Sequence, residues 1–379
     1  MNSLQSSLAK QLALRDTEGT RRFLKPDRHG LTDFTSNDYL GLARSPELFK
    51  AIEQMIDAIK SKSNGATGSR LLSGNSDYTE QVEKKLAGIF KSEASLVFNS
   101  GYAANLGVLS SLPQRGDTIL YDELAHACMK DGARLSLAKR FNFRHNDLND
   151  LESKLKLATG KIFIAVESIY SMDGDQCPLK ELVTLSEKYG ASIILDEAHS
   201  TGVHGDKGAG LAVSLGLEDK IDIRIYTFGK GMGIHGACVA GSSTLRDYLI
   251  NFARPFIYTT ALPPHGLISI ECAFDFLNQN ISLQDVLTKK IEHFVHKLGL
   301  VGENSTSKSS IQSICIGGNH KTKKLATDLQ QKGFDVRPIL SPTVPKETER
   351  LRVCLHTFNT NEEISNLVQS LSSLKSSSK

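Results

Sequence analysis

The middle of the chain alternates between helix-like and strand-like stretches in strict succession. A helical pattern ends near Leu157, a strand covers Ile162 to Val166, a helix runs from Pro178 to Tyr189, and a strand follows from Ser192 to Asp196. Strands separated by helices in this way pair in parallel, and the helices then cover both faces of the sheet. The alternation therefore predicts an α/β fold with a mostly parallel central sheet.

The composition is that of an ordinary globular protein, with 40% hydrophobic and 23% charged residues among 379. The net charge is only +3, which gives no indication of nucleic-acid or anionic-membrane binding. No apolar run is long enough to span a bilayer, and the N-terminus lacks the features of a signal peptide, so we expect a cytoplasmic protein. The six cysteines are scattered without a C-x-x-C pair, so we expect no metal site and no disulfide framework.

Lys230 follows a β-branched run and lies among four glycines, namely Gly229, Gly231, Gly233 and Gly236. Glycines let the backbone approach the lysine closely and adopt positive φ. Two plainer interpretations remain open for this segment. It can be a glycine-rich turn with an exposed lysine, or the G-x-G-x-x-G turn of a nicotinamide-dependent oxidoreductase. The oxidoreductase motif requires a helix next, whereas residues 237–240 have the pattern of a strand.

A second group of polar side chains follows the strand that ends at Asp196, with His199 three residues later. Ligands of open α/β sheets bind outside the carboxyl ends of the strands, where we expect Asp196 to lie. A carboxylate, a histidine and a lysine suit pyridoxal 5'-phosphate, because the lysine amine forms a Schiff base with the aldehyde and the aspartate keeps the pyridine nitrogen protonated. We therefore expect Lys230 and Asp196 to hold pyridoxal phosphate.

The stretch around Gly101 and Tyr102 lies where a short strand, Ser95 to Phe98, turns into a helix. The N-terminus of a helix presents free N–H groups and the positive end of the helix dipole, both of which attract anions. An ordinary helix start needs no ligand, but a cofactor on Lys230 needs a phosphate site nearby. We expect that site at Gly101 and Tyr102.

Four motifs occur along the chain in one order. They are Ser36-Asn37-Asp38-Tyr39-Leu40-Gly41-Leu42, Ser171-Met172-Asp173-Gly174-Asp175, Asp196-Glu197-Ala198-His199 and Thr227-Phe228-Gly229-Lys230-Gly231. Together they resemble the α-oxoamine synthases, pyridoxal-phosphate enzymes of the aminotransferase type I fold, over about Arg15 to His356. The resemblance implies a large domain with a mostly parallel sheet and a smaller C-terminal α/β domain. We expect residues 1–45 to form an N-terminal helix and extended segment, 46–281 the large cofactor-binding domain, and 282–379 the small domain.

The resemblance also implies which residues form the site. The catalytic residues would be Lys230 and His126, whose ring would stack over the pyridine. The cofactor-binding residues would be Gly101, Tyr102, His126, Ser171, Asp196, His199, Thr227, Lys230 and Thr260. The substrate-binding residues would be Arg22, Asn37, Thr343 and Arg352, of which Arg352 would bind the amino-acid carboxylate through its forked guanidinium. Because Thr260 would serve the phosphate of the neighbouring subunit, the resemblance implies a homodimer with active sites at the interface.

Gly229, before the lysine, favours the biotin-pathway branch over serine palmitoyltransferases, which usually carry serine there. The resemblance thus implies decarboxylative condensation of L-alanine with a pimeloyl thioester of coenzyme A or an acyl carrier protein. Relatives that use glycine or serine with another acyl-CoA remain open, because the amino-acid pocket is not readable from the sequence. Thr79, where the family often has histidine, and Leu340, where some members have arginine, depart from the pattern. A catalytically silent partner subunit would be expected to have lost the lysine, so the presence of Lys230 argues against that role.

Overall fold

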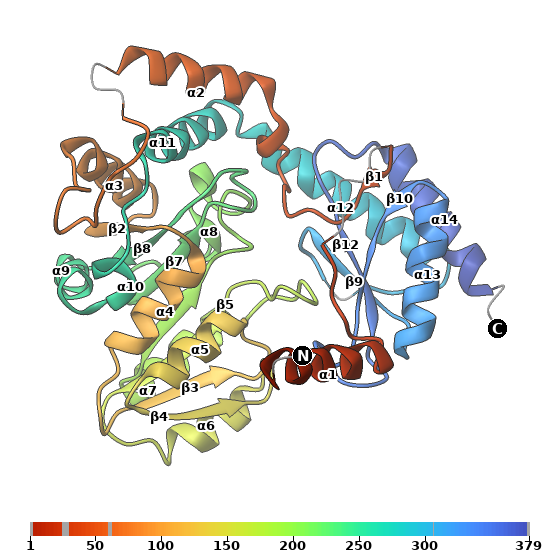
Figure 1. Ribbon diagram of the computed structural model, residues 1–379, viewed down its shortest axis with the longest axis horizontal. Coiled ribbons are helices and arrows are strands. Elements are labelled where there is room, and N and C mark those ends of the chain that lie inside the picture. The colour runs from red at the N-terminus through yellow and green to blue at the C-terminus, as the bar shows by residue number, and fades with distance from the viewer. Residues whose placement is uncertain (1–2, 25–29, 60–62, 306, 377–379) are drawn as a thin grey trace.

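The computed structural model describes residues 3–24, 30–59, 63–305 and 307–376. Two parts are visible, at the left and right of Figure 1. The larger part is built around a seven-stranded sheet, and the smaller, C-terminal part around a three-stranded sheet. The expected division of the chain into domains at residues 45 and 281 stays a proposal.

The seven-stranded sheet confirms the α/β prediction. Its strands, in spatial order, are β2 (Ala94–Phe98), β8 (Ala237–Gly241), β7 (Ile223–Thr227), β6 (Ser192–Asp196), β5 (Ile162–Glu167), β3 (Thr118–Asp122) and β4 (Lys139–Phe143). Only β8 runs antiparallel to its neighbours in this sheet. Because the segment after Gly236 is strand β8, no helix opens on the glycines as a dinucleotide-binding turn requires.

Both faces of this sheet are covered, and alternate residues of each strand face opposite sides. On one face lie α4 (Gly101–Ser111), α5 (Ala127–Leu135), α9 (Ser243–Phe252) and α10 (Arg254–Ile257), and on the other α6 (Leu148–Leu155), α7 (Leu179–Tyr189) and α8 (Gly210–Ser214). Ile194 packs in the core with α4 and α5, whereas Ile193 and Leu195 pack with α6 and α7. This period of two places the polar strand-end residues on defined sides.

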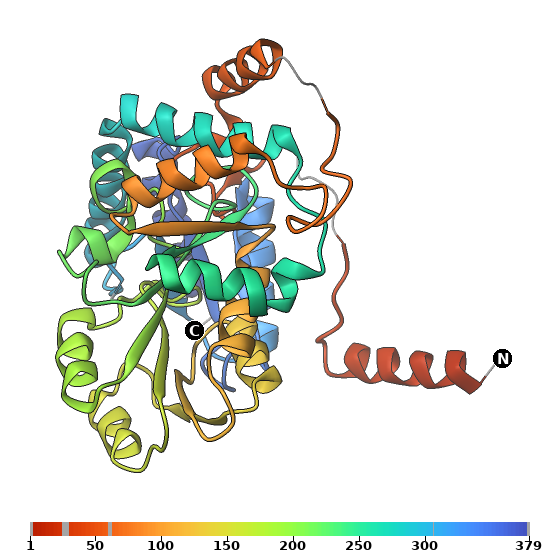
Figure 2. The ribbon, with the colours of Figure 1, turned by 90° about the vertical axis from the view of Figure 1, so that its left-hand side faces the viewer.

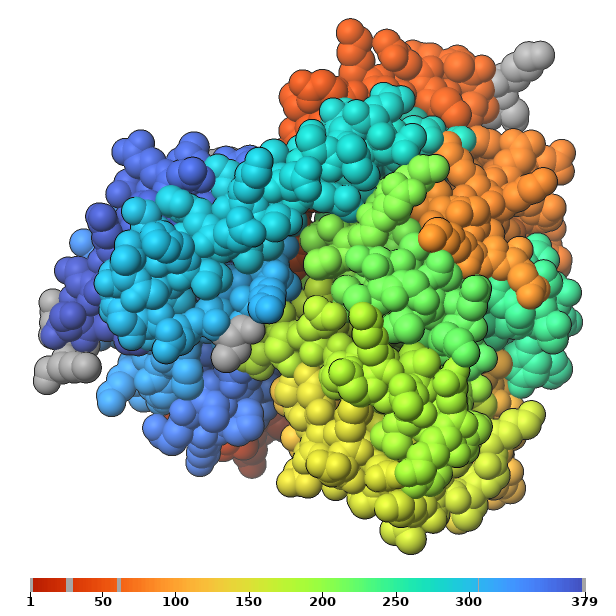
Figure 3. All heavy atoms as spheres, turned by 180° about the vertical axis from the view of Figure 1, so that it is seen from behind, coloured from red at the N-terminus to blue at the C-terminus, as the bar shows by residue number. Residues whose placement is uncertain are grey.

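The smaller part packs helices against an antiparallel sheet of order β11, β12, β9. Its elements are α12 (Ser282–Leu300), β9 (Ile311–Cys315), α13 (Asn319–Gln331), β10 (Phe334–Asp335), β11 (Arg337–Ile339), β12 (Arg350–Cys354) and α14 (Asn361–Ser376). The N-terminal strand β1 (Thr32–Asp33) pairs in parallel with β10. Residues of α11 (Pro264–Gln279) and α12 form a continuous ridge between the two parts (Figure 3).

The first helix is α1 (Ser3–Thr17), on which Leu4, Leu8 and Leu12 are spaced four residues apart. These leucines are 59%, 44% and 43% exposed, and α1 projects away from the rest of the chain (Figure 2). The remaining elements are η1 (Leu42–Arg44), α2 (Pro46–Ala58), α3 (Asp77–Ile89) and η2 (Asp206–Gly208). None of the helices in the described ranges has the length and apolar character that crossing a bilayer needs.

Arg224 is the largest fully buried side chain of the described chain and closes the end of α3. Its Nη1 donates to the Phe90 carbonyl (2.6 Å) and to the Tyr226 hydroxyl (3.0 Å), and its Nη2 donates to the Lys91 carbonyl (3.2 Å). The ring of Phe90 stacks on that of Tyr226 at 3.7 Å. A cation at a helix C-terminus is favoured because the last carbonyls lack partners within the helix.

Replacing Arg224 by leucine removes these three hydrogen bonds and leaves the buried Phe90 carbonyl and the partly buried Lys91 carbonyl without this donor. We expect Arg224→Leu to lower the free energy of unfolding by about 3 kcal/mol, the usual size for lost hydrogen bonds to a charged group. Urea unfolding followed by circular dichroism measures the change. Lys220→Ala, which breaks an exposed ion pair with Glu187, is the control and is expected to leave the midpoint unchanged. Equal midpoints for the two variants would contradict the capping role.

Candidate active site

The carboxyl ends of the parallel strands meet at one edge of the sheet and form a cavity of about 250 Å³. Asp196 is the last residue of β6, Thr227 the last of β7 and Glu167 the last of β5. The residues expected in the site that line this cavity are Asn37, Gly101, Tyr102, His126, Asp196, Thr227 and Lys230. The strand-end argument therefore located the cavity correctly.

Lys230 lies in a tight turn between β7 and β8. The Gly233 N–H donates to the Lys230 carbonyl (2.8 Å), and the Ile234 N–H donates to the Phe228 carbonyl (3.0 Å). Gly233 has φ +64°, and a Cβ there would collide with the backbone of Leu42 and Ala43. The turn thus needs glycine at this position both for its backbone angle and for the close approach of another chain segment.

The amine of Lys230 lies among charged and polar groups at the cavity floor. Its Nζ is 2.8 Å from Nε2 of His199. Burial lowers the pKa of Lys230, and the charges of Asp196 and Glu167 oppose this effect. A lysine whose pKa is lowered by desolvation spends more time as the neutral amine, which is the form that acts as nucleophile or base.

Asp196 is only 4% exposed, and both of its carboxylate oxygens accept hydrogen bonds. Asn105 Nδ2 donates to Oδ2 (2.7 Å), and the Ala198 N–H donates to Oδ1 (2.8 Å). Asn105 comes from α4, so the helix beside the cavity also orients the carboxylate. Sequence reasoning missed Asn105; its position one turn after Gly101, on the expected ligand-binding helix, was the available signal.

His126 caps the N-terminus of α5 and stands exposed at the cavity. The ring Nδ1 of His126 accepts a hydrogen bond from the backbone N–H of Cys128 (3.2 Å), and the backbone N–H of His126 donates to Oε1 of Glu167 (2.7 Å). Partial burial of the ring, together with the charge of Lys230, lowers the pKa of His126. The ring therefore favours its neutral form and presents a flat face that a ligand can contact.

Arg352 reaches the site from β12 in the smaller part. Its Nε donates to the Ser171 carbonyl (2.7 Å), its Nη2 to Oδ1 of Asn37 (3.0 Å) and its Nη1 to Sγ of Cys354 (2.9 Å). Three residues expected from distant motifs are thus in direct contact. His199 and Tyr39 lie beside them, with the Tyr39 hydroxyl 2.7 Å from Nδ1 of His199.

The N-terminus of α4 forms a small cradle with the end of β7. Oγ1 of Thr227 is buried and has no hydrogen-bond partner within the described ranges. A Cβ on Gly101 would collide with the Thr227 methyl group, so the glycine keeps this space open. An unpartnered hydroxyl beside a helix N-terminus fits an anionic group such as a phosphate.

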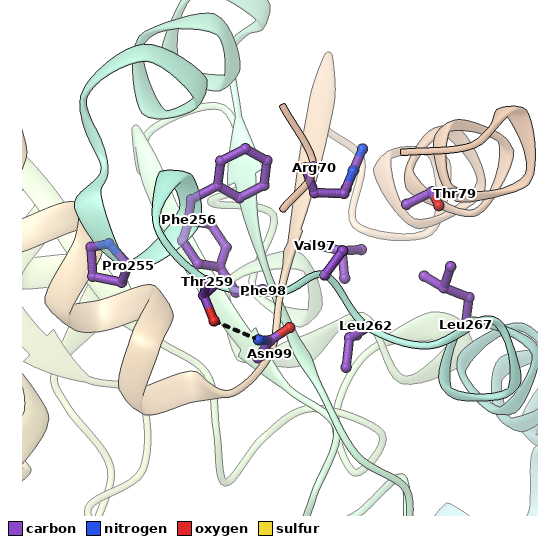
Figure 4. Close-up of a pocket in the computed structure, with 11 residues that line it drawn as sticks. Arg70, Thr79, Val97, Phe98, Asn99, Pro255, Phe256, Thr259, Leu262 and Leu267 are labelled. Atoms are coloured by element: carbon purple, nitrogen blue, oxygen red, sulfur yellow. Dashed lines mark hydrogen bonds between the residues drawn. The ribbon is translucent and has the colours of Figure 1, made fainter. Parts of the chain in front are cut away.

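Six expected residues do not line this cavity. His199 bonds to Lys230, Arg352 bonds to Asn37 and Ser171 bonds to Arg352, whereas the other three are Arg22, Thr260 and Thr343. Arg22 lies in the exposed segment after α1, and Thr343 is exposed in the loop before β12. Thr260 follows α10, where its carbonyl accepts from Asn99 Nδ2 (2.8 Å). Figure 4 shows Asn99 also bonded to Thr259, in a small neighbouring pocket that Thr79 lines as well. The roles expected of Arg22, Thr260 and Thr343 stay predictions.

The sequence analysis also missed Glu167, which is 2% exposed and lines the cavity. It pairs in register with Asp196 on the adjacent strand, so both carboxyl groups face the same side. Glu167 ends β5 as Asp196 ends β6, and the same strand-end rule would have found it. Burial raises the pKa of Glu167 well above its usual value, and the charge of Asp196 adds to the increase.

A mostly parallel sheet whose strand ends share one lysine-containing cavity is the arrangement of the pyridoxal-phosphate-dependent aminotransferase type I fold, and solved structures of that fold superpose on it. The comparisons identify the family. Residues 29–371 match the profile of aminotransferase class I and II, and the chain belongs to that family.

Several named relatives and solved structures are similar to the chain over nearly its whole length. The 8-amino-7-oxononanoate synthase of Emericella nidulans is 41% identical, over 97% of this chain and 95% of the relative. A crystal structure of 8-amino-7-oxononanoate synthase from Francisella tularensis superposes with a TM-score of 0.80 at 30% identity, covering 93% of this chain and 99% of that one. A structure of serine palmitoyltransferase (SPT) with pyridoxal phosphate superposes with a TM-score of 0.89 at 25% identity, covering 100% of this chain and 99% of that one. The resemblance to the α-oxoamine synthases is confirmed.

The raised pKa of Glu167 makes stability depend on pH. In the unfolded chain this carboxyl loses its proton near pH 4.3, whereas in the folded chain it keeps the proton to higher pH. Between the two values the unfolded state binds fewer protons, so the free energy of unfolding falls as pH rises. We expect the Glu167→Gln variant, which keeps the acceptor for the His126 N–H, to lose less stability than the wild type over this range.

Urea unfolding of both proteins at a series of pH values, from mildly acidic to mildly alkaline, measures this difference. Glu187→Gln, which changes an exposed carboxylate, is the control and should keep the slope of the wild type. The same slope in all three proteins would show that Glu167 ionises normally.

Proposed function

We propose that this protein uses pyridoxal phosphate to condense L-alanine with a pimeloyl thioester, releasing carbon dioxide and the free thiol and forming 8-amino-7-oxononanoate. The observation that carries the proposal is the contact of Lys230, Asp196 and Arg352 with one site, in a chain 41% identical to a synthase of that name. The reaction belongs to biotin synthesis.

The residues present fit the cofactor. Lys230 would hold it covalently, Asp196 would pair with its ring nitrogen, and Thr227 with the N–H groups at Gly101 and Tyr102 would hold its phosphate. The buried Thr227 hydroxyl without a partner among the described residues, and the space kept open by Gly101, support this placement. When bound, pyridoxal phosphate supplies an electron sink for the carbon that bears the amino group.

Lys230 is the residue placed to move a proton at the alanine Cα. As the neutral amine it can accept that proton, and as the ammonium it can return one to the product at the same carbon. The lowered pKa brings the two forms closer in population at neutral pH. His126, exposed at the same cavity, would position the acyl group by contact with its ring.

Arg352 would bind the alanine carboxylate. A planar guanidinium can offer two parallel N–H groups to a carboxylate, which fixes orientation as well as position. In the structure its Nη2 is held by Asn37 and its Nε by the Ser171 carbonyl, so the group is already aimed at the turn that lines the cavity. Reactions that use glycine or serine remain the alternative. The contacts of Arg352 would recognise the carboxylate of the amino-acid substrate and not its side chain.

A homodimer with shared sites is part of the proposal. Thr260 and Arg22 lie outside the cavity of their own chain, as residues that serve a neighbouring subunit would, and Asn99 holds the Thr260 backbone in place. The cytoplasmic location and the choice between coenzyme A and an acyl carrier protein stay predictions.

The first test is product formation from L-alanine and pimeloyl-CoA, followed by mass spectrometry. Lys230→Ala is expected to lower turnover by about 10²–10⁴-fold or more, because it removes the group that moves the proton. Borohydride reduction of the wild type with pyridoxal phosphate should leave the cofactor on Lys230, and Lys220→Ala should behave as the wild type. Turnover with glycine or serine but not alanine would reject the biotin assignment, and the absence of a label on Lys230 would reject the cofactor.

The second test concerns the carboxylate contact. Arg352→Lys keeps the positive charge but loses the planar guanidinium with its two parallel N–H groups. We expect the KM for alanine to rise about tenfold to a hundredfold, which corresponds to the loss of one or two hydrogen bonds to a charged group. The KM for the thioester should stay within about twofold. A steady-state analysis with each substrate varied in turn measures both constants, and an unchanged alanine KM would remove Arg352 from the site.

The third test concerns the phosphate cradle. Gly101→Ala places a methyl group in the space beside Thr227, and we expect the affinity for pyridoxal phosphate to fall about tenfold or more. Gly88→Ala is a matched control, since a Cβ at Gly88 in α3 meets nothing within 4 Å. Titration of the cofactor-free chain with pyridoxal phosphate, followed by absorbance, compares the two. Equal affinities would show that the phosphate binds elsewhere.

A further inference from the structure

An unbroken chain of hydrogen bonds joins Arg352 to Lys230. Nη2 of Arg352 donates to Oδ1 of Asn37 (3.0 Å), and the Tyr39 hydroxyl lies 3.0 Å from the same oxygen. That hydroxyl is also 2.7 Å from Nδ1 of His199, and Nε2 of His199 is 2.8 Å from Nζ of Lys230. One end of this chain lies on β12 of the smaller part, and the other end lies in the turn after β7.

Two of the three residues between Arg352 and Lys230 in this chain are shielded from water. Tyr39 is 1% exposed and His199 is 4% exposed. Tyr39 is fixed through its backbone, because its carbonyl accepts from the Thr357 N–H (2.9 Å) and its N–H donates to the Asn37 carbonyl (2.9 Å). Bulk water therefore cannot substitute for a missing partner, and each donor in the chain must point at an acceptor within it.

The number of protons allows two arrangements. Arg352 can only donate, so Asn37 must present its oxygen, and that oxygen only accepts. Burial lowers the pKa of His199 well below its usual value, so the ring carries one proton. Either Tyr39 donates to Asn37 and receives the Nδ1 proton of His199, or Tyr39 donates to Nδ1 and His199 donates from Nε2 to a neutral Lys230.

Only the first arrangement leaves Nε2 of His199 free to accept from the lysine amine. While no substrate is bound, Arg352 and Tyr39 both donate to the one oxygen of Asn37, and two donors on one acceptor weaken each other's hydrogen bond. A carboxylate on Arg352 draws the guanidinium away, and Asn37 then accepts from Tyr39 alone. The first arrangement is then more populated than before. In it Lys230 donates to Nε2 of His199, and a lysine that donates in this way holds its proton more tightly.

We propose that Tyr39 is a positioning residue that couples the binding of a carboxylate at Arg352 to the proton affinity of Lys230. The inference rests on the proposed function, since it takes the amino-acid carboxylate as the ligand of Arg352. The result is that Lys230 becomes a stronger base when the substrate whose proton it must accept is in place.

The test uses the full chain without added cofactor and propionate as a carboxylate that lacks an amine. Competitive acetylation over a range of pH values, quantified peptide by peptide, gives the pKa of Lys230 directly. In the wild type we expect propionate to raise this pKa by about 0.5 to 1, the effect of one hydrogen bond. In Tyr39→Phe, which keeps the ring but lacks the hydroxyl, the increase should vanish.

Two further variants separate coupling from a loss of structure. Tyr78→Phe removes another hydroxyl, bonded to Glu271 at 2.6 Å, and should keep the full response to propionate. Arg352→Ala should abolish the response while Tyr39 is intact. Nitrogen-15 spectra of histidine-labelled protein should show the His199 proton moving to Nδ1 on addition of propionate in the wild type, and no such movement in Tyr39→Phe.

The outcomes distinguish this proposal from the function on which it rests. A wild type that forms product from alanine but whose Lys230 does not respond to propionate would overturn the coupling and leave the function standing. An equal response in the wild type and in Tyr39→Phe would overturn the role of Tyr39. A protein that neither fixes pyridoxal phosphate on Lys230 nor turns over an amino acid would overturn the function itself.

Discussion

The parallel pairing of β5, β6 and β7 is the constraint on which the rest of the site depends. Parallel strands end at the same edge, so Glu167 and Asp196 stand in register and Thr227 follows one strand further along. Antiparallel pairing would have sent these side chains to opposite edges. The helices that parallel pairing requires also supply the N-terminus of α4 beside the same edge. Fold and site are thus consequences of one pattern of strand direction.

The same geometry creates an electrostatic problem, because two carboxyl groups and one amine are brought together away from water. Asp196 is oriented by two donors, whereas the Glu167 side chain accepts a hydrogen bond from the backbone N–H of His126. The two carboxyl groups therefore differ in environment, and burial raises the pKa of Glu167. Two neighbouring acids whose environments differ in this way can serve separate tasks in one site. Here Glu167 keeps its proton to a higher pH than an ordinary carboxyl group does.

The sequence was sufficient for the alternating core and for residues that obey a local rule. Asp196 and Gly101 followed from strand ends and a helix start, and Lys230 from its glycines. Arg352 could be assigned only through the family resemblance, because an arginine on a short strand shows nothing locally of the Asn37 it reaches across 315 positions. Tyr39 was missed because its partner His199 is 160 residues away. Contacts of this kind depend on how two parts of the chain pack, which spacing does not encode.

The close approach at Gly233 connects the turn that carries Lys230 to the smaller part of the structure. Gly233 lies against Leu42 and Ala43, and the segment that contains them is bound to the C-terminal sheet, where the Cys354 N–H donates to the Phe34 carbonyl (2.8 Å). A rigid rotation of the C-terminal part would carry this segment with it and press it on the lysine turn. The segment from Phe34 to Ala43 would then transmit the rotation, and the position of the Lys230 amine would depend on the angle between the larger and the smaller part.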